Sequence, residues 1–306
     1  MSGKASRGSS LPAIGISAVG FWSSALPDWT VARAVFRGEG EPVEGGARRP
    51  SPALLPPAER RRVPDSVAAA LEAASQALAA SGLDAADVPS VFTSAYGDLA
   101  GTDALCASLA EPVPMLSPTR FHNDVHNAAA GYWCIATGCR QASSAVSAHV
   151  RSFAAGLLEA ATLCVADDTP VLLVGFDGAP TGPLVDVVAS RGLLAVAMVL
   201  LPPSALPGRA MAELHLAIEP DDTTGTGGSG DTGSSSRAPA GSADDAARTL
   251  EDNAMADALP LCEALAAGAR AAWRQALSDH ACLALRLEPV SSDASLASRA
   301  SAPTPP

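Results

Sequence analysis

Aromatic residues are scarce in this sequence: Phe, Trp and Tyr together make up 4% of its 306 residues. Hydrophobic residues still make up 48%, so a sizeable core must be built mainly from Ala, Val and Leu. No stretch approaches the roughly 20 apolar residues of a membrane span. Positive charge is also in short supply, and the formal net charge is −12. This balance argues against nucleic acid as a partner and against binding to anionic membranes.

C-x-x-C pairs are absent as well. The six cysteines lie mostly in apolar stretches, which is typical of reduced, buried thiols rather than of a disulfide framework. Near the N-terminus, Lys4 and Arg7 precede the apolar run 11–21 and so imitate a signal peptide. Pro12 and Gly15 interrupt that run, and a strand fits it better. We therefore expect a cytoplasmic protein.

The hydrophobic pattern predicts alternating strands and helices. Apolar runs bounded by turn residues predict strands, and apolar residues at helical spacing predict helices. The expected strands are 14–22, 88–94, 143–148, 170–175, 193–201 and 214–218, and the expected helices are 28–36, 64–81, 103–109 and 152–165. Residues 117–138 should form a loop that enters a helix. Continuous apolar strands that alternate with helices indicate an α/β fold with a mostly buried sheet.

Composition divides the chain into five parts. Residues 1–11 should be a disordered N-terminus, and 12–219 the main domain. The segment 220–253, rich in Gly, Ser, Thr and Asp, should be a low-complexity insertion or linker. Residues 254–289 should add a helix (254–277) and a strand (280–287) to the same domain. A disordered tail should occupy 290–306.

The densest polar motif is His122-Asn123-Asp124-Val125-His126-Asn127. On one helix, His122 and His126 would share a face at metal-ligand spacing. A zincin would need Glu directly after the first histidine, where Asn123 stands, and no third ligand is marked. We favour a polar network and predict no metal and no cofactor. No serine lies in a G-x-S-x-G elbow, and the glycine-rich segment 225–230 lacks the lysine of a phosphate loop.

A small-residue strand runs directly into a helix at 143–160. A side chain at this junction would face the helix N-terminus, where the dipole stabilises negative charge and lowers the pKa of a thiol. The junction is thus suited to a nucleophile, yet it supplies His149 and Val150 rather than cysteine.

Taken together, three motifs resemble the N-terminal domain of the β-ketoacyl synthase family. They are SPTRFHN at 117–123, HNAAAGYW at 126–133 and GLLEA at 156–160. More narrowly, they look like the short chain-length-factor-like partners of the type II ketosynthases for aryl polyene pigments. The likeness covers 12 to about 202 and implies a thiolase-like fold, layered α/β with a mixed sheet. The run Arg60-Arg61-Arg62 would be a solvated or ion-paired face, with a partner or phosphopantetheine contact as the alternative.

The resemblance places Val150 at the position of the synthase cysteine. Valine has no lone pair with which to attack a thioester. The two histidine motifs of the synthases are also absent from these 306 residues. The resemblance therefore implies a non-catalytic subunit that forms a heterodimer with an active synthase and meets acyl carrier protein directly or through that synthase. Cavity or interface candidates are His122, Asn123, His126, Asn127, Tyr132, Trp133, Ile135 and His149.

Two other functions remain open from the sequence. One is an acyltransferase or thioesterase that reuses the fold, with His126 or His149 as base. The other is a scaffold in which Tyr132 and Trp133 are ordinary core residues.

Overall fold

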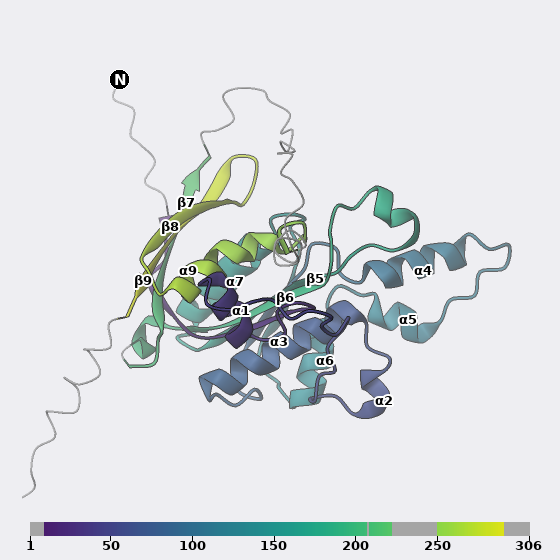
Figure 1. The fold of residues 1–306 in the computed structure, drawn as a ribbon, viewed down its shortest axis with the longest axis horizontal. Coiled ribbons are helices and arrows are strands. Elements are labelled where there is room, and N and C mark those ends of the chain that lie inside the picture. Colours follow the sequence, from purple (N-terminus) through teal and green to yellow (C-terminus); the bar gives the residue numbers. More distant parts are fainter. Residues whose placement is uncertain (1–8, 207, 222–249, 291–306) are drawn as a thin grey trace, which may run out of the picture.

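The computed structural model describes residues 9–206, 208–221 and 250–290. A single mixed sheet runs through these residues in the order β4-β3-β5-β6-β2-β7-β9-β8, with β1 paired to β7 (Figure 1). The strands are β1 (Ser9–Ser10), β2 (Ile14–Ser23), β3 (Ser90–Thr93), β4 (Ser143–Val146), β5 (Val171–Asp177), β6 (Leu194–Leu201), β7 (Ala212–Pro220), β8 (Ala271–Ala276) and β9 (Ala281–Pro289). Only β3 pairs in parallel, with β4 and β5; the other pairs are antiparallel. The predicted mixed, layered α/β fold is confirmed.

Helices cover both faces of the sheet, because successive side chains of each strand point to opposite sides. In β5, Leu172 and Val174 pack in one apolar cluster while Val171 and Leu173 pack in the other. The helices are α1 (Trp29–Phe36), α2 (Pro57–Arg60), α3 (Asp65–Ser81), α4 (Leu99–Leu109), α5 (Pro118–Asn123), α6 (Ala128–Thr137), α7 (Ser152–Ala166) and α9 (Leu259–Ala267). Helices α3 and α6 contribute to the first cluster, and α7 and α9 to the second.

Helix α3 lies very close to the sheet because six of its ten buried residues are alanine. A Cβ atom built on Gly20 of β2 would lie 1.9 Å from the backbone oxygen of Ala73 in α3. Only glycine fits this contact. Small residues thus let the backbone of α3 pack directly against the backbone of β2, in a core that has few aromatic side chains.

The segment after the insertion differs from its prediction. The expected helix 254–277 is wrong: α9 ends at Gly268, whose φ of +61° is the left-handed conformation that terminates helices. From Ala271, partly or fully buried residues alternate with exposed ones along the chain, and β8 forms. Both β8 and β9 extend the sheet of the main domain.

Three smaller expectations also need correction. Ser9 and Ser10 are not disordered but form β1. Residues 117–138 form two helices, α5 and α6, rather than a loop and one helix. Cys106 is exposed. The predictions for residues 1–8, 222–249 and 291–306 lie outside the described residues, and within those described no helix is both long and apolar enough to cross a membrane.

Candidate functional site

Three chain segments meet at one edge of the sheet. Because β3, β4 and β5 are parallel neighbours, their carboxyl ends lie together. The turn 94–97 follows β3, the junction 147–151 follows β4, and Asp177 is the last residue of β5. This edge is the place where an α/β fold of this type usually carries its site.

The junction after β4 is a sharp elbow that enters α7. His149 has a φ of +54°, a conformation that costs a non-glycine residue energy and is often found at functional sites. The Ser152 hydroxyl holds the turn closed, since it accepts from the Ala148 N–H at 2.9 Å and donates to the His149 carbonyl at 2.6 Å. The side chain of His149 lies 3.1 Å from the Tyr96 hydroxyl, Nε2 to Oη. Val150 follows and is 54% exposed.

The N–H groups in the first turn of α7 face acceptors within the chain. Ser152 N donates to the His149 carbonyl at 3.1 Å, and Ala155 N donates to the Arg151 carbonyl at 3.0 Å. Between them, the N–H groups of Ala154 and Phe153 face the carboxylate of Asp257. A carboxylate from the segment after the insertion therefore lies at the N-terminus of α7, where the helix dipole favours negative charge.

Burial raises the pKa of Asp257 to about 7, and the nearby charge of Asp177 adds to the rise, while the N–H groups of Ala154 and Phe153 partly offset it. Asp257 Oδ1 has no hydrogen-bond partner among the described residues. Its backbone carbonyl accepts from the Gln275 amide. The same segment also contacts the elbow through an ion pair between Arg151 and Asp279, with nitrogen and oxygen 2.7 Å apart. The segment 250–289 thus contacts residues 151–154, where the elbow enters α7.

Asp177 organises the turn after β3. Its carboxylate accepts from the Ser94 hydroxyl at 2.9 Å and from the N–H groups of Ala95 and Tyr96 at 2.7 and 3.0 Å. Burial raises its pKa to about 6, against the lowering effect of these hydrogen bonds and of His126. Ring nitrogen Nε2 of His126 lies 3.2 Å from the Ser94 carbonyl, within hydrogen-bonding distance.

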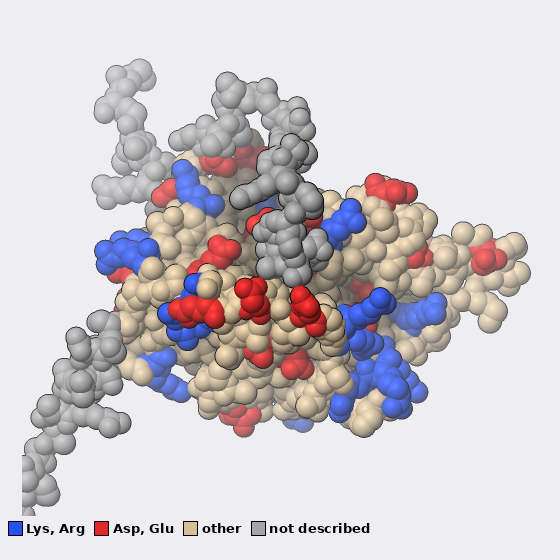
Figure 2. All heavy atoms as spheres, in the orientation of Figure 1, with Lys and Arg blue, Asp and Glu red and all other residues tan. Residues whose placement is uncertain are grey.

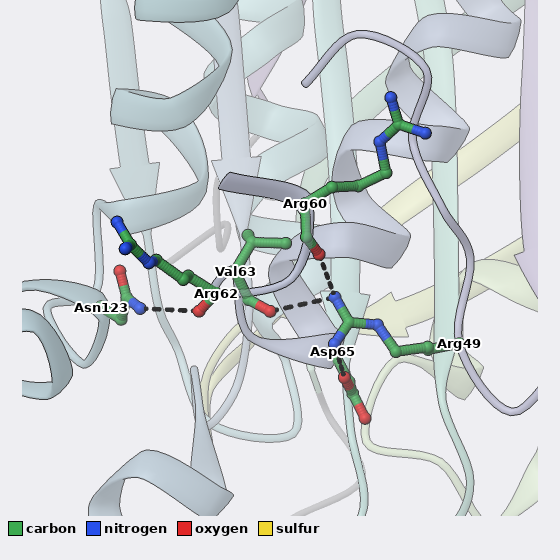
Figure 3. A network of polar contacts seen from close by, with 6 residues as sticks. All are labelled: Arg49, Arg60, Arg62, Val63, Asp65 and Asn123. Carbon is green, nitrogen blue, oxygen red and sulfur yellow. Dashed lines mark hydrogen bonds and ion pairs between the residues drawn. The ribbon is translucent and has the colours of Figure 1, made fainter. Parts of the chain in front are cut away.

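A groove of about 830 Å³ lies beside α6. Its walls come from the segment before α2, from α5 and from α6, and they are Leu54, Leu55, Pro56, Glu59, Arg62, Pro118, Thr119, His122, Val125, Asn127, Ala128, Gly131, Tyr132, Ile135 and Ala136. The Tyr132 hydroxyl donates to Asn123 Oδ1 at 2.9 Å. Figure 3 shows the second bond, in which Asn123 Nδ2 donates to the Arg62 carbonyl at 3.2 Å. This chain of hydrogen bonds fixes the groove wall, which is largely apolar with a polar rim.

A family model for the N-terminal domain of β-ketoacyl synthases matches residues 37–278. The chain belongs to the β-ketoacyl synthase family. No curated protein matches the sequence.

Solved structures share the synthase fold at low identity. The ketosynthase (ApeO) in complex with its chain length factor (ApeC), from Xenorhabdus doucetiae, matches at 20% identity and a TM-score of 0.64, over 90% of this chain and 99% of that chain. The ishigamide ketosynthase/chain length factor matches at 16% and 0.63, over 92% and 100%. A β-ketoacyl synthase from Burkholderia phymatum matches at 13% and 0.54, over 69% and 65%. These likenesses confirm the thiolase-like ketosynthase fold.

The structure separates several of the site residues predicted in this synthase-like chain. His122 lies in α5 and His126 in the turn after it, so they do not share a helix face as the spacing suggested. His122 packs edge-on against Tyr132 in the groove. Trp133 points instead into the core and is buried. Ile135 is 82% exposed at the groove rim. Within the described ranges, no three His, Cys, Asp or Glu residues gather as a metal site would require.

Sequence reasoning missed Asp177, Asn253 and Asp257. Asp177 had a signal, because it is the last residue of a wholly buried strand, where a charged residue needs a partner. Asn253 is buried and donates to the carbonyls of Arg191 and Asp177 at 2.7 and 3.4 Å. Nothing local marks Asn253 or Asp257, because their partners lie far away in the sequence.

Proposed function

We propose that this chain is a non-catalytic, chain-length-factor-like subunit that pairs with an active β-ketoacyl synthase. The observation that carries the proposal is the elbow. By resemblance to the family motif, Val150 would stand at the position of the cysteine, and neither neighbour, His149 or Arg151, supplies a thiol. In addition, Asp257 faces the N–H groups of α7 that would favour a negative nucleophile. Both observations support loss of the condensation chemistry.

Two exposed surfaces of the described chain support the proposal of a partner subunit. Strand β4 ends the sheet, and Ser143 and Ala145 on it are exposed. Such an edge invites pairing with another strand. The arm formed by α4 and α5, which projects from the body in Figure 1, carries exposed apolar side chains at Leu109, Val113, Met115, Leu116 and Phe121. We infer that the synthase covers this edge and arm and forms a heterodimer with this chain, as the complex of the ketosynthase ApeO with its chain length factor ApeC suggests.

The groove beside α6 would then become a closed cavity at the interface. Its apolar walls suit an acyl or polyene chain, and Tyr132, held by Asn123, would limit the length of that chain. The motifs at 117–133 favour an aryl-polyene or fatty-acid-like polyketide as the product class. Replacing Tyr132 with Ala should lengthen the products. Unchanged length with an intact complex would instead favour a scaffold.

The pairing can be tested by co-expression with the cognate synthase and affinity capture. Ala145→Pro removes an exposed edge residue's N–H and should abolish capture. Ile218→Arg, an exposed change on β7 away from the β4 end of the sheet, is the matched control and should leave it intact. Capture that survives Ala145→Pro would refute pairing through β4, and failure of the wild type to capture any synthase would refute the function.

The acyl-transfer alternative requires a base and a nucleophile at the elbow. The described site offers the Tyr96–His149 pair but no thiol at the elbow, and its serine hydroxyls donate to backbone carbonyls, Ser152 to His149 and Ser147 to Ala95. Thioesterase turnover that disappears in His149→Ala would revive this alternative.

A further inference from the structure

Two of the six cysteines lie at the same end of one helix. Cys134 begins the last turn of α6, and Cys139 follows the glycine at which the helix ends. Both are free thiols, and Cys134 is half-buried whereas Cys139 is buried. A small reagent in solvent therefore reaches Cys134 first.

The backbone brings Cys139 back over the end of α6. Gly138 has a φ of +70°, the left-handed conformation that ends helices and returns the next residue to the last turn. The Thr137 hydroxyl holds this return in place. It accepts from the Cys139 N–H at 3.3 Å and donates to the Trp133 carbonyl at 2.8 Å. Cys139 is thus fixed against the turn that carries Cys134.

The side chains of the pair meet beside the edge of the sheet. The thiol of Cys134 faces the sulfur of Cys139 and the hydroxyl of Ser143 on β4. Cys139 Sγ lies 3.6 Å from the Val88 carbonyl, to which it donates. Two thiols side by side, one open to solvent and one behind it, are the arrangement in which a first oxidation product is captured by a second sulfur.

A small, uncharged oxidant suits this pair. The chain carries a net charge of −12, and Figure 2 shows Asp and Glu side chains distributed over the visible face. An anionic low-molecular-weight disulfide would be repelled by this charge. A hydroperoxide is neutral and small enough to reach a half-buried sulfur.

We propose that Cys134 and Cys139 are a peroxide-oxidisable pair that forms an intrachain disulfide. The Cys134 thiolate attacks hydrogen peroxide, so that an S–O bond forms, the O–O bond breaks and hydroxide leaves. The Cys139 sulfur then attacks the sulfenic acid on Cys134. The S–S bond forms, the S–O bond breaks, and the second oxygen leaves as water with the Cys139 proton. The two thiols lose two electrons, and the peroxide is reduced to two molecules of water.

The bond would fix the end of the helix that carries the groove wall. Gly131, Tyr132, Ile135 and Ala136 of α6 line the groove, and Cys134 lies among them in the sequence. In reducing compartments, disulfides of this kind are usually transient. The pair is a modification site whether or not the chain binds a synthase, so the inference stands apart from the proposed function.

The test uses one peptide of the full chain. Trypsin cleaves after Arg120 and Arg140 and so releases residues 121–140, which contain both cysteines of the pair and no other. After hydrogen peroxide and then alkylation in denaturant, this peptide should carry no alkyl group and be about 2 Da lighter than the reduced peptide. Dithiothreitol should reverse the change. Cys106→Ser removes an exposed cysteine and, as the matched control, should form the bond equally.

Dimedone, which traps sulfenic acids, tests the order of attack. Cys139→Ser should accumulate dimedone on Cys134, whereas the wild type should carry about a tenth of this label or less, because Cys139 consumes the intermediate. Equal melting temperatures of the reduced proteins show that the fold is intact. The wild-type peptide decides the question even if a variant does not fold.

The rate of oxidation should depend on pH. Burial raises the pKa of the Cys134 thiol and the neighbouring Cys139 adds to the rise, while Ser143 offsets part of it. The thiolate is therefore a small fraction at pH 7, and the rate should increase about tenfold by pH 8. A peptide alkylated at both cysteines after peroxide, equal dimedone labelling of the wild type and Cys139→Ser, or a rate unchanged between these pH values would overturn the proposal.

Discussion

Asp257→Asn should remove a large part of the pH dependence of folding stability. Burial raises the pKa of this carboxyl from its ordinary value of 3.8 to about 7. The folded state therefore holds a proton that the unfolded chain releases at lower pH. Stability from this proton is fully present below pH 3.8, declines as the pH rises and is gone above pH 7. Asparagine cannot ionise and keeps an oxygen for the N–H groups of α7.

The size of the stability change follows from the pH range between the unfolded and folded pKa values of Asp257. About two pH units of this range lie between pH 5 and pH 7, and the free energy of unfolding changes by about 1.4 kcal/mol for each unit. Between pH 5 and pH 8 the wild type should therefore lose about 3 kcal/mol more than Asp257→Asn. The neighbouring Asp177, whose pKa is raised to about 6, titrates in the same range in both proteins. The difference between the two proteins reports the titration of Asp257 together with its electrostatic coupling to Asp177.

Urea unfolding at pH 5, 6, 7 and 8 measures this difference. Asp252→Asn is the matched control, because it removes an exposed carboxylate from the same segment and should leave the pH profile unchanged. Parallel profiles for the wild type and Asp257→Asn would refute the placement of this carboxylate in a buried site at the start of α7.

Three further predictions concern single contacts. Gly20→Ala should destabilise the fold by about 3 kcal/mol or prevent folding, because its Cβ would lie 1.9 Å from Ala73 O, whereas Gly131→Ala meets nothing within 4 Å and should change urea stability by less than about 0.5 kcal/mol. Asn253→Ala should cost about 2 kcal/mol in the same assay, since the carbonyls of Arg191 and Asp177 lose a buried donor. Val150→Cys should react with a thiol reagent yet form no condensation product; condensation by this variant would contradict the non-catalytic assignment.

Much of the main domain could be predicted because its signals are local. Apolar runs such as 193–201 and helices ended by glycine, as α3 is by Gly82, carry their own boundaries. The strand-to-helix junction at 143–160 was predicted for the same reason. The left-handed conformation of His149 was not, because only glycine or asparagine would have marked it in the sequence.

The features that sequence reasoning missed depend on distant partners. The Ala- and Leu-rich stretch 254–277 has the composition of a helix, but pairing with β9 turns its second half into β8. Asp257 looks like a surface acid until the fold brings it to α7. The polar motif at 122–127 suggested one helix face, whereas the turn between α5 and α6 sends His126 toward Ser94.

Reconstituted condensation tests the proposed role of this chain. The chain alone, its cognate synthase alone and the two together would each be given acyl- and malonyl-carrier proteins, and the products separated by mass. The proposal predicts no product from the chain alone and products of defined length only from the co-purified pair. Condensation by the chain alone, or identical products from the synthase with and without it, would contradict the proposal.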